Sequence, residues 1–280
     1  MRYLITGANG YLGQGIVRQL INDNNIVIAS DCSINNIDTR AIIKKSDLFQ
    51  INDPFAFFEE PDVLLHLAWR DGFIHNASSH IEDLSKHYYF LKKMIESGVK
   101  RIAVMGTMHE VGFFEGSIRD DIPTNPLSLY GIGKDALRKI VSLLCESAGI
   151  SYQWLRAYYI VGTSESGCSV FSKIVKADKA GEKKFPFTSG MNQCDFLDYD
   201  LFCLQTAAAI EQDEITGIIN ICNGRPERLS EKVEEFIRKN QFDIKLDYGK
   251  YPDRPYDSKA VWGDDTKIQA ILRNRAKVLK

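Results

Sequence analysis

The sequence lacks the features that would place the protein in a membrane, on nucleic acid or around a metal ion. None of its apolar runs approaches the length that spans a bilayer, and 35 basic against 37 acidic residues leave a net charge of only −2. The six cysteines contain no C-x-x-C pair, and the five histidines have no metal-ligand spacing. We therefore expect reduced, mostly buried thiols, no metal, and no nucleic-acid or membrane partner.

Internal repeats, low-complexity tracts and the apolar segment of a secretory signal are also lacking. The first expected strand begins at residue 2, so we expect a cytoplasmic protein. The hydrophobic content of 44% and charged content of 26% are ordinary for a globular chain. A chain of 280 residues can then form one large α/β domain, or one domain with a small lobe.

The most informative stretch is residues 3–13, which read YLITGANGYLG. Residues 3–6 predict a buried strand and residues 11–21 a helix. Gly7 and Gly10 lie between the two elements, and Gly13 lies within the helix. A strand, a glycine turn and a helix N-terminus place backbone N–H groups around a pyrophosphate. The spacing is one residue longer than G-x-G-x-x-G, and a glycine-rich turn before an ordinary helix is the alternative.

An acidic residue at the end of the next expected strand supports dinucleotide binding. Residues 25–30 predict that strand, and Asp31 follows it, 18 residues beyond Gly13. A carboxylate there can bind both hydroxyls of the adenosine ribose and would repel a 2′-phosphate, which favours NAD over NADP. The alternative is an aspartate that only caps a turn or a helix.

Strands and helices alternate through the first half of the chain, which predicts a doubly wound parallel sheet over residues 1–162. The further strands are expected near 42–48, 62–68, 100–105 and 152–157, and the main helices at 81–97 and 129–146. Residues 163–280 have a looser pattern and predict a smaller lobe, from which some segments return to the sheet. Helices are expected there at 169–180, 200–211, 230–239 and 264–272, and extended segments at 185–188 and 217–222.

Three residues form a candidate catalytic set. Tyr130 and Lys134 lie one turn apart on the helix expected at 129–146, and Thr107 follows the strand expected at 100–105. We expect the ammonium, with the positive nicotinamide of an oxidised cofactor, to lower the pKa of the phenol. Alone, the tyrosine and lysine could be an ordinary helix start and the threonine a turn residue. Their combination with the glycine turn and Asp31 favours the functional interpretation.

These motifs resemble the extended short-chain dehydrogenases/reductases, in the NAD-dependent epimerase/dehydratase family that modifies nucleotide sugars. TGANGYLG resembles the cofactor turn of the family, HLAW at 66–69 its H-L-A-A, GTMHEVG its S-S-x-x-V-Y-G, and NPLSLYGIGK its P-x-S-x-Y-x-x-S-K. Weaker similarities are DFL at 195–197 to R-D-F-[IV], and RPYD at 254–257 to R-P-G-D. The resemblance covers most of the chain.

The resemblance implies a Rossmann sheet with a small C-terminal substrate-binding lobe, NAD as cofactor, and a homodimer. In the implied mechanism Tyr130 exchanges the proton, Lys134 lowers the pKa of Tyr130 and binds the nicotinamide ribose, and Thr107 hydrogen-bonds the reacting oxygen. The implied cofactor-binding residues are Gly7, Asn9, Gly10, Tyr11, Leu12, Gly13, Asp31, Cys32, Asp47, Leu48, Leu67, Ala68, Trp69, Met105, Tyr130, Lys134 and Tyr158.

The substrate side is less well defined. The resemblance implies substrate contacts by Thr107, His109, Phe187 and Arg254, but His109 could face solvent, Phe187 could belong to the lobe core, and Arg254 could be a surface charge. The chain also departs from the family pattern: Ser85 and Tyr159 stand where asparagine is frequent, Cys194 where an arginine commonly meets the diphosphate, and Gly106 where a serine is usual.

The resemblance leaves more than one activity open. We favour an NAD(H)-dependent 4-keto-reductase of a nucleotide-activated deoxysugar, as in the biosynthesis of cell-surface polysaccharides, because the chain is short and Met108 and His109 replace the Asp-Glu pair of a dehydratase. Asp31 keeps a 4-epimerase as the alternative, since biosynthetic reductases often use NADPH. A non-catalytic dinucleotide-binding sensor or scaffold is the second alternative. The helices expected at 81–97 and 129–146 are apolar on more than one face, which favours the homodimer.

Overall fold

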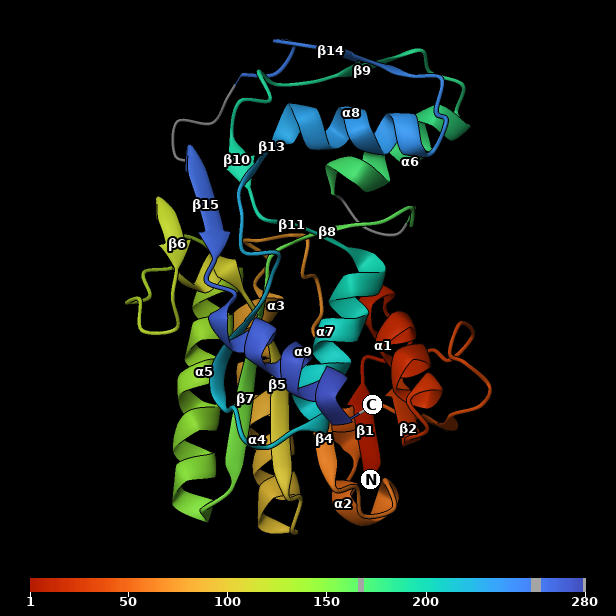
Figure 1. Cartoon of the computed structure of the whole chain (residues 1–280). Helices are drawn as coiled ribbons and strands as arrows, with labels where there is room; N and C mark the ends of the chain where they lie inside the picture. The colour runs from red at the N-terminus through yellow and green to blue at the C-terminus, as the bar shows by residue number, and fades with distance from the viewer. Residues whose placement is uncertain (166–168, 253–257, 279–280) are drawn as a thin grey trace.

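The computed structural model describes residues 1–165, 169–252 and 258–278, and its centre is a seven-stranded parallel sheet (Figure 1). The strand order is β12-β7-β5-β4-β1-β2-β3. All neighbouring pairs are parallel, which confirms the predicted doubly wound α/β class. The strands are β1 (Arg2–Thr6), β2 (Ile26–Asp31), β3 (Ile42–Lys45), β4 (Val63–His66), β5 (Arg101–Thr107), β7 (Ser151–Ala157) and β12 (Gly217–Ile221).

The order of the strands reverses between β1 and β4. From β1 the chain proceeds through β2 to β3 on one side, and then from β4 through β5 and β7 to β12 on the other. The residues after β1 and β4 touch: a Cβ on Gly7 would lie 2.7 Å from the backbone nitrogen of Ala68. Ligands of open α/β sheets bind at the carboxyl ends of the strands at such a reversal, so this point marks the site.

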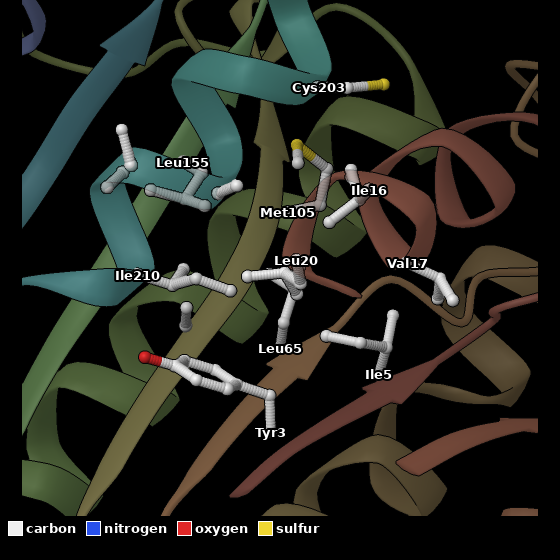
Figure 2. Close-up of a cluster of buried hydrophobic side chains, with 14 of the residues drawn as sticks. Tyr3, Ile5, Ile16, Val17, Leu20, Leu65, Met105, Leu155, Cys203 and Ile210 are labelled. Atoms are coloured by element: carbon white, nitrogen blue, oxygen red, sulfur yellow. The ribbon is translucent and has the colours of Figure 1, made fainter. Parts of the chain in front are cut away.

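Helices cover both faces of the sheet (Figure 1). The helices α1 (Tyr11–Asn22), α7 (Tyr199–Glu211) and α9 (Thr266–Val278) cover one face, and α2 (Pro54–Phe57), α4 (Leu84–Glu96) and α5 (Leu129–Ala148) the other. Successive strand residues point to opposite faces. Tyr3 and Ile5 therefore pack with α1 and α7 (Figure 2), whereas Leu4 packs with α4 and α5. This two-sided burial explains the nearly continuous apolar strands of the sequence.

The C-terminal half contributes both to the sheet and to a lobe above its carboxyl edge (Figure 1). β12 pairs with β7, α7 packs on α1, and α9 packs on α7 and β12. The lobe is built from α6 (Val170–Lys179), α8 (Leu229–Lys239) and short strands that form one four-stranded and two two-stranded sheets. Those strands are β6 (Gly116–Ile118), β8 (Tyr159–Val161), β9 (Lys184–Pro186), β10 (Gln193–Cys194), β11 (Phe196–Asp198), β13 (Glu227–Arg228), β14 (Lys245–Asp247) and β15 (Ala260–Gly263).

Three element boundaries differ from those expected. The helix expected at 81–97 is divided at Asp83 into α3 (Ser79–Glu82) and α4, and the buried carboxylate at the division binds Arg70 and Lys86 at 2.9 and 2.7 Å. β5 continues to Thr107, so that residue ends the strand instead of following it. The last helix, α9, continues past residue 272, where it was expected to end, because Arg275 pairs with Asp23 and Glu211.

No helix in the described parts of the chain has the length and apolar character needed to cross a membrane.

A buried carboxylate joins the lobe to the sheet. Asp195, between β10 and β11, accepts hydrogen bonds from the backbone nitrogens of Asn223 (2.7 Å), Gly224 (2.9 Å) and Gly263 (3.1 Å). Its side chain is fully buried. These three donors follow β12 or end β15, so one side chain fixes where both strands enter the lobe.

We expect Asp195→Ala to destabilise the protein strongly, because it leaves three buried backbone donors without their acceptor. Each such loss costs roughly 1–3 kcal/mol, so the free energy of unfolding should fall by about 3 kcal/mol or more. Urea denaturation measures the change. The exposed Asp213→Ala is the matched control and should stay within about 0.5 kcal/mol of wild type. A similar small change for both variants would show that Asp195 does not have this role.

Candidate active site

The parallel sheet places the expected cofactor residues along one edge. Thr107 ends β5, Ala68 and Trp69 follow β4, Gly7 follows β1, and Asp31 ends β2. These four strands are consecutive neighbours in the sheet. Residues separated by up to a hundred positions in the sequence therefore lie along one edge of the sheet, at the strand reversal.

The glycine turn has the geometry required of a phosphate site. Gly7 has φ of +70°, and a Cβ on Gly13 would lie 2.4 Å from the Gly7 carbonyl oxygen. Gly10 is the N-cap of α1; it is exposed, and no side chain caps the helix there. The first N–H groups of α1 thus remain available to an anion, and the absence of a Cβ at Gly10 leaves room for its approach.

Asp31 lies beside this turn. One of its carboxylate oxygens accepts a hydrogen bond from the Asn9 backbone nitrogen at 3.0 Å, and the side chain of Asn9 accepts one from the Asn36 nitrogen at 2.8 Å. The carboxylate is therefore fixed beside the glycine turn. Of the neighbouring expected contacts, Cys32 is exposed, and Asp47 caps the 3₁₀ helix η1 (Leu48–Gln50) by accepting from the Phe49 nitrogen.

Several expected cofactor side chains are used in packing. Tyr11 stacks on Tyr199 with ring centroids 4.4 Å apart, and Tyr158 is buried and donates to Asn220 Oδ1 at 3.3 Å. The backbone carbonyl of Tyr11 accepts a hydrogen bond from Tyr199 Oη at 2.5 Å, which leaves its backbone N–H, at the start of α1, beside the glycine turn. Leu12, Leu48, Leu67 and Met105 are likewise packed in or against the two hydrophobic cores.

Thr107, Tyr130 and Lys134 are brought together below the lobe. The side chains of Tyr130 and Thr107 share a hydrogen bond, and Thr107 Oγ1 also accepts from the His109 backbone nitrogen at 3.3 Å. Lys134 Nζ donates to the Met105 carbonyl at 2.8 Å. The N-terminus of α5 is held from outside, since the Tyr130 nitrogen donates to the His75 carbonyl at 2.8 Å.

Burial controls the electrostatics of these groups. It raises the pKa of Tyr130 to about 12, against the opposing hydrogen bond from Thr107, and it lowers the pKa of Lys134 to about 7. The expectation that the ammonium lowers the pKa of Tyr130 is therefore wrong for the protein by itself. The reason is that burial disfavours the charged form of both side chains, so near pH 7 the phenol is neutral and the lysine is close to its titration midpoint.

A buried ionic cluster below Thr107 was not foreseen. Glu110, in the 3₁₀ helix η2 (Met108–Glu110), accepts from the Thr107 backbone nitrogen at 2.6 Å and from Trp154 Nε1 at 2.8 Å. The guanidinium groups of Arg138 and Arg156 each lie 3.7 Å from its carboxylate. Burial raises the pKa of Glu110, while Arg156 and the Thr107 N–H oppose that rise.

The same cluster explains the glycine that replaces the usual serine. A Cβ on Gly106 would lie 2.0 Å from Trp154 Nε1 and 2.6 Å from Glu110 Oε1. A side chain at this position is incompatible with the bond between Trp154 and Glu110. The one signal in the sequence was a glutamate at the valine position of S-S-x-x-V-Y-G, where an apolar residue is usual.

All five histidines gather around Trp69 and Tyr130, which the sequence did not predict. His75 stacks on Tyr130 with centroids 5.4 Å apart and contacts His109 at 4.7 Å. The remaining three, His66, His80 and His87, contact one another or Trp69. In the described ranges no three His, Cys, Asp or Glu side chains are arranged to hold a metal ion.

The expected substrate residues have different outcomes. His109 lies against Tyr130, with ring centroids 6.2 Å apart, and burial together with His75 lowers its pKa to about 4, so the imidazole is neutral near pH 7. Phe187 is only 3% exposed and packs in the lobe core, so its expected stacking on a base does not fit the structure. Arg254 lies outside the described residues.

The low pKa of Lys134 predicts a pH dependence of stability. The unfolded chain, with an ordinary lysine pKa near 10.4, binds one more proton between about pH 7 and pH 10 than the folded chain does. The free energy of unfolding of wild type, relative to Lys134→Met, should therefore rise with pH in this window, with a slope of up to about 1.4 kcal/mol per pH unit. Urea denaturation at pH 7, 8 and 9 measures it. Lys139 is exposed on the same helix, and the free energy of unfolding of Lys139→Met should have the same pH dependence as that of wild type. The same pH dependence in Lys134→Met would contradict the prediction.

Comparison with known proteins identifies relatives that match nearly the whole chain. The chain is 41% identical to dTDP-6-deoxy-L-talose 4-dehydrogenase (NAD(+)) of Aggregatibacter actinomycetemcomitans, over 94% of this chain and 99% of that protein. The fold is similar to that of UDP-glucose 4-epimerase from Thermotoga maritima, solved with UDP-glucose (TM-score 0.80, 20% identity, all of both chains). It is also similar to that of UDP-glucuronic acid 4-epimerase from Bacillus cereus, solved with UDP-glucuronic acid and NAD (TM-score 0.81, 20% identity, 98% of this chain and 93% of that one). A family model matches residues 3–222, and the chain belongs to the NAD dependent epimerase/dehydratase family.

Proposed function

We propose that this protein is an NAD-dependent oxidoreductase that interconverts the hydroxyl and keto forms of C4 in a dTDP-linked 6-deoxysugar, in the cytoplasm. The observation that carries the proposal is the grouping of Thr107, Tyr130 and Lys134 beside the glycine turn and Asp31. The name of the 41% identical relative supports the 4-position, the dTDP group and NAD. A dehydrogenase and a 4-keto-reductase catalyse the same reaction in opposite directions.

The cofactor fits the residues that are present. Asp31 would bind the adenosine ribose, the N–H groups at the start of α1 the pyrophosphate, and Lys134 the nicotinamide ribose. When bound, NAD supplies the hydride acceptor for oxidation, or the donor for reduction, together with the charge of its oxidised ring. The structure leaves these polar groups along one edge of the sheet, at the strand reversal.

The catalytic residues divide the remaining work. Tyr130, once ionised, takes the proton from the C4 hydroxyl at its Oη during oxidation, and the neutral phenol gives that proton to the C4 oxygen during reduction. Thr107 Oγ1 hydrogen-bonds the same oxygen and, through its bond to Tyr130, orients the phenol. Lys134 places a titratable positive charge one helical turn from Tyr130, which stabilises the phenolate. This intact set distinguishes the proposal from a non-catalytic sensor.

Turnover tests the proposal directly. Purified protein with NAD+ and dTDP-6-deoxy-L-talose should produce NADH, measured by absorbance, and a 4-keto sugar nucleotide, measured by mass spectrometry. Interconversion of UDP-glucose and UDP-galactose without net NADH would instead identify a 4-epimerase.

In that assay Tyr130→Phe should bind NAD almost normally but lose roughly 10²–10⁴-fold in kcat, because only the proton-transferring hydroxyl is removed. Tyr152→Phe, on β7, is the matched control and should keep the wild-type rate. Near-normal turnover by Tyr130→Phe would refute the mechanism.

Asp31 should make the protein prefer NAD to NADP, because its carboxylate repels a 2′-phosphate. Asp31→Ser should weaken NAD binding and reduce the preference, whereas Asp213→Ser, at an exposed position between α7 and β12, should leave both unchanged. Titration of each variant with both cofactors measures the ratio of the two Kd values. Equal or tighter NADP binding by wild type would count against this placement of Asp31.

We also propose that the protein is a homodimer formed through α4 and α5, which pack side by side. Tyr89 and Leu143 point outward and are 60% and 64% exposed, whereas Leu91 and Leu137, which share these helices, are buried in the core. Light scattering at micromolar concentration should give twice the chain mass, and Leu143→Lys should lower it toward one chain. A single-chain mass for wild type would rule out the dimer.

A further inference from the structure

Lys134 is a buried cation without a carboxylate partner of its own. It is 3% exposed, and its ammonium lies 2.8 Å from the Met105 carbonyl oxygen. Glu110 pairs with Arg138 and Arg156, and Asp135 pairs with Arg138 and Lys139. None of the ion pairs found in the described parts of the chain includes Lys134. The charge of Glu110 raises the pKa of Lys134 without forming a salt bridge to it, so the buried ammonium needs a further source of negative potential in contact with it if it is to remain charged.

The indole of Trp69 supplies that potential. The Lys134 Nζ lies over its ring, 4.0 Å from the centroid. An aromatic face attracts a cation through its quadrupole, and the attraction is strongest for tryptophan and for desolvated cations. Trp69 ends the HLAW motif, where the family to which the motif is similar has alanine. The ring is therefore an addition to the common site.

Contacts with two histidines and a backbone carbonyl fix the indole in place. Its Nε1 donates to His80 Nδ1 at 2.9 Å, and His80 Nε2 lies 3.0 Å from the Ile74 carbonyl oxygen. An indole N–H can only donate and a carbonyl can only accept, so His80 must be the neutral tautomer with its proton on Nε2. His87 stacks on the same indole at 4.7 Å and 14°. The ring cannot turn without breaking these contacts.

We propose that Trp69 is a positioning residue for the catalytic pair of Tyr130 and Lys134. Its indole face holds the Lys134 ammonium and so keeps the charge beside Tyr130 without an ion pair to a carboxylate. The role in catalysis rests on the proposed function, but the hold on the ammonium does not require a substrate. Trp69 also meets Tyr130 edge-on, with ring centroids 6.4 Å apart, so the indole contacts or adjoins both members of the pair.

The inference predicts a measurable change in the titration of Lys134. A cation–π contact in a buried site should sustain the pKa by about half a unit to one and a half units. The other titratable groups that face Lys134 are Glu110, His66, His87 and, on its own helix, Tyr130. Burial keeps the pKa of His66 well below its ordinary value and lowers that of His87 to about 3, so neither histidine titrates near pH 7.

Fluorinated tryptophan tests the contact without altering its shape. Wild type is produced with singly, doubly or triply fluorinated tryptophan, and the Lys134 resonance of ε-¹³C-lysine is titrated by NMR, assigned by its loss in Lys134→Met. Each added fluorine weakens the ring quadrupole, so the pKa of Lys134 should fall stepwise. The control is Trp69→Phe produced with the same fluorinated tryptophans. This variant retains Trp154 and Trp262, and its Lys134 pKa should not fall stepwise. An unchanged pKa in wild type, or an equal fall in the control, would overturn the proposal.

Kinetics provide a second, independent measurement. With the lysine titrating near pH 7, the fluorinated wild type should lose about three- to tenfold in kcat at pH 8, little at pH 6, and little in substrate KM. Equal losses at both pH values would argue against a role through the ammonium. A protein without any turnover would refute the proposed function, while the NMR titration would still decide the position of Lys134.

Discussion

The close approach of two strand exits is the constraint on which the site depends. β1 and β4 are adjacent only because the strand order reverses between them, and the turn after β1 then touches the backbone after β4. This contact requires glycine at position 7, both for its positive φ and because a Cβ would lie 2.7 Å from Ala68. The glycine turn, Asp31, Trp69 and Thr107 are placed along one edge of the sheet as a consequence.

Burial then determines which side chains at this edge of the sheet are charged. It opposes charge on both Tyr130 and Lys134, so the ligand-free protein favours a neutral phenol beside a partly protonated lysine. Charge must be brought into the site before a proton can leave the phenol, and an oxidised nicotinamide ring brings one. In the proposed mechanism, loss of the Tyr130 proton would in this way be coupled to the binding of the oxidised cofactor.

Gly106, Glu110 and Trp154, which pack next to Thr107, occupy one another's space closely. Gly106 leaves the space in which Trp154 reaches Glu110, and Glu110 in turn holds the backbone of Thr107. A change at any one of these positions disturbs the others, because the interior has no spare volume. The two departures from the family motif, Gly106 and Glu110, are therefore linked by one set of contacts.

The local pattern of the sequence determined much of this protein. Alternation of buried strands with amphipathic helices predicted the doubly wound sheet, and the glycine turn, Asp31, Thr107, Tyr130 and Lys134 were identified from their positions relative to those elements. The sheet was predicted correctly because strand ends and helix faces follow from periodicity, while the roles of the named residues stay predictions. The resemblance of the motifs predicted the family that the comparisons then established.

Tertiary structure decided what depends on contacts between distant segments. The gathering of His66, His75, His80, His87 and His109 around Trp69 and Tyr130 has no sequence spacing to reveal it. The burial of Phe187 and the direction of the pKa shift of Tyr130 also depend on which atoms exclude water, and those atoms come from other elements. Sequence periodicity specifies which face of an element is buried, but only the packed chain specifies what it is buried against, and that determines the charge of a buried group.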